Sequence, residues 1–101
     1  MFDMFGKLGE IKERVEATKE HLKTVSVTAE AEGGAVRVEV SGDRKVRNIS
    51  IKPELLAEGD AEHLEDVILI AVNRGLEQAQ ALEAAELKEA AGGLLPPGFN
   101  P

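Results

Sequence analysis

The chain has 101 residues, enough for one small domain with a modest core, and a net charge of −7. It contains no cysteine, which excludes disulfides, thiolate metal sites and cysteine nucleophiles. No apolar stretch approaches the roughly 20 residues of a membrane span, and the first residues lack the layout of a secretory signal, so we expect a cytoplasmic protein. A chain this short would gain stability by pairing with a second copy, which makes a dimer a hypothesis from the outset.

Acidic and basic residues are separated along the chain. Residues 37–52 hold five basic and two acidic side chains, whereas residues 53–101 hold ten carboxylates and two basic side chains. This distribution can present one cationic surface to a polyanion while the acidic remainder limits non-specific association.

A helix is predicted from Met4 to about Thr24. Apolar or small residues recur there at alternating steps of four and three and form a seam: Met4, Leu8, Ile11, Val15, Thr18 and Leu22. Basic residues flank this seam on both sides: Lys7, Lys12, Arg14, Lys19 and His21. Two such helices in parallel would repel each other, so the partner of the seam is either an acidic helix of the same chain or an anionic ligand.

Residues 25–52 alternate between apolar and polar side chains, which predicts a meander of three antiparallel strands. Gly33-Gly34 is typical of a two-residue hairpin turn, and a second turn is expected around residues 42–45. The expected cross-strand pairs are Val27–Val40, Ala29–Val38, Ala31–Val36, Glu30–Arg37, Val38–Ile49 and Val36–Ile51. Helices should cover the apolar face. The opposite face is expected to be open to water or to a hydrophilic partner, and carries Ser26, Thr28, Glu30, Arg37, Glu39, Ser41, Asn48, Ser50 and Lys52.

A long helix is predicted from about Ala61 to Ala91, after Pro53 has ended the third strand. Asp60 is its expected N-cap. At about 1.5 Å per residue the helix would reach about 45 Å, so its far end should project from the domain or pack on another subunit. Gly75 in its interior indicates a close crossing with the sheet.

Residues 1–93 are therefore predicted to form a single α+β domain, followed by a proline- and glycine-containing tail at residues 94–101. Three interpretations of this tail stay open: disorder, docking onto its own dimer, and recognition by another protein.

Catalytic motifs are missing from the sequence. His21 and His63 are isolated from other strong metal ligands, and no glycine belongs to a phosphate-binding loop. We therefore expect no enzymatic activity, catalytic residue, metal ion, cofactor or small-molecule substrate.

Five segments occur in an order and spacing that together resemble one family: Met4-Phe5-Gly6-Lys7, residues 46–56 (VRNISIKPELL), Leu64-Glu65-Asp66-Val67, Ala71-Val72-Asn73 and Leu95-Pro96-Pro97-Gly98-Phe99. On these segments the chain resembles the YbaB/EbfC family of small nucleoid-associated proteins over nearly its whole length. The resemblance implies a tweezer-like homodimer with a central sheet and projecting helices, no catalysis, and binding of double-stranded DNA with little sequence requirement.

Phosphate neutralisation would be the mechanism of such binding, with an affinity that falls with salt at a log–log slope of about −0.9 per phosphate contacted. The candidate DNA-binding residues are Lys7, Lys12, Arg14, Lys19 and Lys23 of the first helix, and Arg37, Arg44, Lys45 and Arg47 of the sheet. No aromatic residue is interleaved with the basic strand, so stacking on single-stranded nucleic acid is poorly supported.

The alternative is a dimeric protein–protein interaction module with weak or no DNA binding, in which the basic residues complement the acidic helix. A DNA replication or repair protein also stays open as a partner. Contacts of Lys12, Arg14 and Lys19 with Glu77, Glu83 or Glu86 would favour the alternative over the DNA-binding hypothesis.

Overall fold

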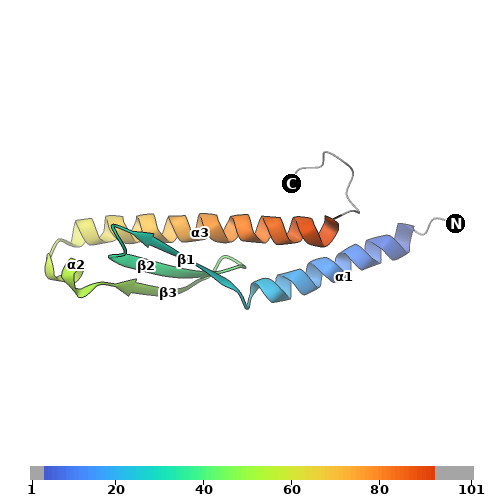
Figure 1. Ribbon diagram of the computed structural model, residues 1–101, viewed down its shortest axis with the longest axis horizontal. Helices are drawn as coiled ribbons and strands as arrows, with labels where there is room; N and C mark the ends of the chain where they lie inside the picture. The colour runs from blue at the N-terminus through green and yellow to red at the C-terminus, as the bar shows by residue number, and fades with distance from the viewer. Residues whose placement is uncertain (1–3, 93–101) are drawn as a thin grey trace.

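In the computed structural model, which describes residues 4–92, six elements follow one another along the chain (Figure 1). They are α1 (Met4–Leu22), β1 (Ser26–Ala31), β2 (Val36–Ser41), β3 (Val46–Ile51), α2 (Pro53–Ala57) and α3 (Ala61–Ala91). The predicted α+β class, with an N-terminal helix, a three-stranded meander and a long C-terminal helix, is confirmed. The predicted tail at residues 94–101 lies outside the described residues.

The strands pair in the order β1-β2-β3, and all six predicted cross-strand pairs are present. The first turn has its two glycines at positive φ, with Gly33 at 64° and Gly34 at 87°, and the amide of Ala35 donates to the carbonyl of Glu32 over 3.1 Å. Glu32 also has a positive φ, of 51°, and the last strand pair is Ala31–Val36, so the turn spans residues 32–35 instead of the two predicted residues. A bulge between Glu39 and Val40, which periodicity did not predict, shifts the register so that Val40 pairs with Val46.

Both long helices lie close to their predicted bounds. The Asp60 carboxylate accepts a hydrogen bond from the amide of His63 over 3.1 Å, which confirms Asp60 as the N-cap of α3. The first helix ends at Leu22, two residues before the predicted end, because the chain turns there and Thr24 donates to the carbonyl of His21. The short helix α2 was not predicted. It begins at Pro53, whose fixed φ and missing amide hydrogen suit the first position of a helix.

The core lies between α3 and the first two strands. Val36, Val38 and Val40 of β2 are fully buried against Ala71, Gly75 and neighbouring residues of α3. A Cβ atom added at Gly75 would lie 2.7 Å from Cγ2 of Val40 and 3.0 Å from Cγ2 of Val38, which confirms the close crossing.

Substitution of Gly75 by alanine is therefore expected to destabilise the protein. The helix propensity gained is about 1 kcal/mol, whereas overpacking against two rigid, buried valines costs about 1–3 kcal/mol. Gly9 of α1 is a matched control, because a Cβ atom there meets nothing within 4 Å. In urea unfolding, Gly9→Ala should leave the free energy of unfolding unchanged or raise it, and Gly75→Ala should lower it. Equal stabilisation by both substitutions would contradict the close packing.

The apolar face of the sheet is only partly covered within one chain, contrary to the prediction that helices cover all of it. Val46 and Ile49 of β3 remain 41% and 42% exposed. A single helix about 10 Å wide covers about two strands spaced by about 4.8 Å. The other long helix, α1, extends past the end of the sheet beside the C-terminal half of α3 instead of crossing the sheet (Figure 1).

Candidate nucleic-acid interface

The first helix forms a projecting arm whose apolar seam is covered at one end only. Leu22 is buried and Val15 and Ile11 are half-buried, whereas Leu8 is 57% exposed and Phe5, outside the seam at the same end, is 87% exposed. Near the sheet, the arm lies against the acidic half of α3 across a groove of about 300 Å³. The lining residues are Ala17, Thr18, His21, Glu86, Glu89 and Ala90. The acidic helix of the same chain is thus the partner of the C-terminal half of the seam.

Among the described residues, the acidic helix forms no ion pair with Lys12, Arg14 or Lys19, which are exposed beside the seam. Lys19 lies 3.9 Å from Glu16 of its own helix. Within residues 4–92, Lys12 and Arg14 form no ion pair, and neither they nor Lys19 contact Glu77, Glu83 or Glu86. Lys7 is exposed on the same helix. The contacts that would have favoured the protein–protein interaction module are thus missing from the described part of the chain, which favours an anionic ligand for Lys12, Arg14 and Lys19.

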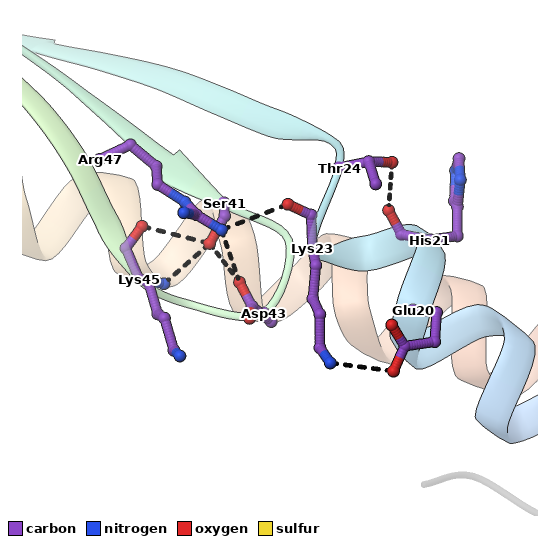
Figure 2. A network of polar contacts seen from close by, with 8 residues as sticks. All are labelled: Glu20, His21, Lys23, Thr24, Ser41, Asp43, Lys45 and Arg47. Atoms are coloured by element: carbon purple, nitrogen blue, oxygen red, sulfur yellow. Dashed lines mark hydrogen bonds and ion pairs between the residues drawn. The ribbon is translucent and has the colours of Figure 1, made fainter.

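Lys45 and Arg47, two of the candidate DNA-binding residues of the sheet, lie next to the C-terminal end of α1 (Figure 2). Arg47 of β3 donates from Nη2 to the carbonyl of Lys23 over 3.3 Å. The amide of Gly42 donates to the carbonyl of Val25 over 2.9 Å. We call the set Lys23, Arg44, Lys45 and Arg47 the basic junction. Residues that are separated by about 20 positions in the sequence form one surface there, at the base of the arm.

The packing of Gly42 on Leu22 fixes this junction. A Cβ atom at Gly42 would lie 2.8 Å from both the carbonyl oxygen and Cδ2 of Leu22. Only glycine allows the turn between β2 and β3 to approach the helix so closely. The position of the arm relative to the sheet therefore depends on a backbone contact that hydrophobic periodicity does not encode.

A buried serine organises the turn of the junction. Ser41 was predicted on the open polar face but is only 1% exposed. Its buried hydroxyl donates to the Asp43 carboxylate and accepts from the amide of Lys45 over 3.1 Å. The Ser41 hydroxyl lowers the pKa of Asp43 below its usual value, and Lys45 and Arg47 contribute in the same direction. Asp43 is thus ionised at neutral pH and lies 4.0 Å from Arg47.

Besides Lys19 and Arg47, three further candidate cations have carboxylate partners. Lys23 lies 2.9 Å from Glu20, and this hydrogen bond raises the pKa of Lys23. Arg44 lies 3.2 Å from Glu83 of α3. Arg37 lies 3.1 Å from Glu30 on the polar face, at the opposite end of β2, so the structure does not bring Arg37 to the junction.

Both histidines join separate elements, which sequence spacing did not predict. His21 of α1 lies 3.8 Å from Glu86 of α3, and His63 of α3 lies 2.9 Å from Glu32 in the first turn. Glu32 and His63 both lie in acidic segments, so only the His21–Glu86 contact had a signal in the sequence, the basic flanks of the seam opposite the acidic helix. Together the two contacts hold α3 against the arm at one end and against the sheet at the other.

The His63–Glu32 contact makes stability depend on pH. The hydrogen bond to Glu32 raises the pKa of His63 above its ordinary value of about 6.5, with a smaller contribution from Glu58. Because the pKa of His63 is higher in the folded than in the unfolded protein, the pair stabilises the fold fully below about pH 6.5. This stabilisation is lost as the pH rises through the folded-state pKa. We expect the free energy of unfolding to decline over this range, and expect His63→Gln and Glu32→Gln to flatten the decline. An unchanged decline in both variants would exclude this pair as its source.

No helix among residues 4–92 is long and apolar enough to span a membrane. Within the same residues, no group of three or more His, Asp and Glu side chains is placed to hold a metal ion.

Comparison with known proteins gives the arm and the junction a context. The sequence model of the YbaB/EbfC DNA-binding family matches residues 1–94. The chain belongs to this family. Two similar proteins carry the name nucleoid-associated protein. The one from Acetivibrio thermocellus is 42% identical over 80 residues, which is 79% of this chain and 71% of the relative. The one from Alkaliphilus metalliredigens is 36% identical over 99 residues, which is 98% of this chain and 87% of the relative.

A crystal structure of an uncharacterised protein from Helicobacter pylori has the same fold as this member of the YbaB/EbfC family. The TM-score is 0.78 at 22% identity, and the match covers 91% of this chain and all of the other. At this identity the likeness concerns the fold alone. It shows that the combination of sheet, long helix and arm occurs in a second, distantly similar protein.

Proposed function

We propose that this protein is a nucleoid-associated, non-enzymatic protein that works as a homodimer and binds the phosphate backbone of duplex DNA with little sequence preference. The proposal places it in the cytoplasm on the nucleoid. Family membership supports DNA as the partner, and the related proteins of Acetivibrio thermocellus and Alkaliphilus metalliredigens carry the name nucleoid-associated protein.

One observation carries the proposal: the arm presents cations that the acidic helix does not neutralise. Lys12 and Arg14 are exposed and form no ion pair within residues 4–92. In a chain of net charge −7 that contains many carboxylates, unpaired cations on a projecting helix are available for an external anion. The basic junction extends this surface to the base of the arm, so backbone phosphates along one stretch of duplex would be in reach.

The proposed dimer explains the uncovered part of the sheet. Leu69 is spaced by seven residues from Leu76 and by fourteen from Glu83, so all three lie on one side of α3. Because Glu83 contacts Arg44 in the turn between β2 and β3, this side faces β3. Leu69 is 59% exposed and lies on the side of the open residues Val46 and Ile49. We call Val46, Ile49 and Leu69 the open apolar surface, and propose that a second copy covers it.

A second candidate function is a dimeric protein–protein interaction module that binds DNA weakly or not at all. The contacts Arg44–Glu83 and His21–Glu86 favour it, because they use basic groups to hold the acidic helix. A DNA replication or repair protein would be the partner in that case. This candidate accounts for Arg44 but leaves Lys12 and Arg14 without a role.

The proposal is tested by measuring DNA binding with fluorescence anisotropy. Two duplexes of unrelated sequence and one of the matching single strands serve as probes. We expect both duplexes to bind at micromolar concentrations and to agree within about threefold, and the single strand to bind more weakly. A tenfold preference for one duplex would contradict binding through the backbone alone. No binding to any of the three would favour the interaction module.

A further inference from the structure

Arg44 is aimed at the acidic helix by the backbone of its turn. The residue has a φ of 67°, in the left-handed region that arginine rarely adopts. Hydrogen bonds of 2.8 Å from the amide of Arg44 to the carbonyl of Ser41, and from the amide of Ser41 to the carbonyl of Lys45, close the turn. This conformation places Nε of Arg44 3.2 Å from Oε1 of Glu83.

The contact differs from the other ion pairs of the junction in where its acid comes from. Asp43 and Glu20 pair with residues close to them in the sequence, at separations of four and three residues. Glu83 reaches the junction from a separate element, α3, and its side chain is 23% exposed, whereas that of Arg44 is 53% exposed. A ligand can therefore approach the guanidinium while the carboxylate occupies part of its hydrogen-bonding capacity.

A carboxylate and a phosphate use the same donors of a guanidinium group. We propose that Glu83 competes with DNA phosphate for Arg44 and thereby lowers the affinity of the basic junction for duplex DNA. This inference rests on the proposed function. In the free protein Arg44 is paired with Glu83, and on binding a backbone phosphate displaces the carboxylate. Glu83 thus keeps non-specific binding weak at the base of the arm, while Lys12 and Arg14 stay available.

The test compares Glu83→Gln with Glu77→Gln on duplex DNA at several salt concentrations. Both substitutions remove one negative charge from α3, so their long-range effects match. Glu77 lies seven residues after Ile70 and fourteen after His63, on the side of α3 that faces β1, and forms no ion pair with any described residue. Glu77 forms no ion pair within residues 4–92, and the Arg44 end of the Arg44–Glu83 pair is 53% exposed, so both variants should fold, which circular dichroism checks.

We expect Glu83→Gln to bind more tightly than Glu77→Gln at about 50 mM salt. For each protomer whose Arg44 gains a phosphate, the log–log slope of affinity against salt should steepen by about 0.9. The affinity for DNA should then fall by an additional factor of about three between about 50 and 200 mM salt. In an Arg44→Gln background, Glu83→Gln should have no more effect than Glu77→Gln.

Each other outcome bears on one proposal or on both. If the unmodified protein binds DNA and the two variants respond equally, the competition is excluded and the proposed function stands. If Glu83→Gln keeps its advantage in the Arg44→Gln background, the effect does not act through Arg44 and the inference is wrong. If none of the proteins binds, both the inference and the proposed function are overturned.

Discussion

Charge reversal on the arm, by Lys12→Glu together with Arg14→Glu, is expected to lower the affinity for duplex DNA by at least about 100-fold at about 50 mM salt. A dimer loses four cations in this way, and each phosphate contact contributes about 0.9 to the log–log salt slope. The slope should therefore become less steep by about 3.6 if all four cations contact phosphates. Stability should change little, because both side chains are exposed and form no ion pair within residues 4–92.

The control for this experiment is Lys52→Glu together with Lys88→Glu. These residues are exposed, lie outside the arm and the basic junction, and change the net charge by the same amount. The control should retain most of the affinity. An equal loss in both double variants would mean that only the net charge matters, and would contradict a binding role of the arm.

Ile49→Asp is expected to convert a dimer into monomers at micromolar concentrations. Ile49 lies on the edge strand β3 and belongs to the open apolar surface, and an unpaired carboxylate buried in an interface is strongly unfavourable. The mass measured by light scattering should fall from twice 10.8 kDa to 10.8 kDa. Weakened DNA binding should accompany this change, because a monomer offers only one arm to the duplex.

Ile70→Asp is the matched control for this interface. Ile70 is 46% exposed, similar to the 42% of Ile49. It lies on the side of α3 that faces β1, since Arg74, one turn further along, donates to the carbonyl of Glu30 over 2.9 Å. The control should remain a dimer. Dissociation by Ile70→Asp and not by Ile49→Asp would move the proposed interface to the other side of α3.

The strands and the long helix could be predicted because local signals determine them. Alternation of period two and the turn at Gly33-Gly34 together define the strand register, and the structure has every predicted pair. Asp60 and Gly92 stand at the two ends of α3. The bulge at Val40 had no such signal. The same alternation fits a regular strand, so only the paired structure reveals the shift.

The candidate site was harder to predict because it depends on contacts between distant segments. The residue types were evident, but the approach of Gly42 to Leu22 and the hydrogen bond from Arg47 to the carbonyl of Lys23 involve no periodic pattern. The direction of Arg44 follows from its positive φ, which a sequence of ordinary turn residues does not specify. For these reasons Arg37 was grouped with the other basic residues of the sheet, whereas the structure places Lys23 beside them instead. Glu83 was considered only as a partner of the basic residues of the arm, and not of Arg44.

The salt dependence of binding by the unmodified protein tests the central claim most directly. With Lys12 and Arg14 of both protomers on phosphates, the affinity for a random-sequence duplex should be micromolar or tighter at about 50 mM salt and fall by at least about 100-fold at about 200 mM. No binding at the lower salt concentration, or an affinity that does not change with salt, would contradict a protein that binds the DNA backbone through its arms.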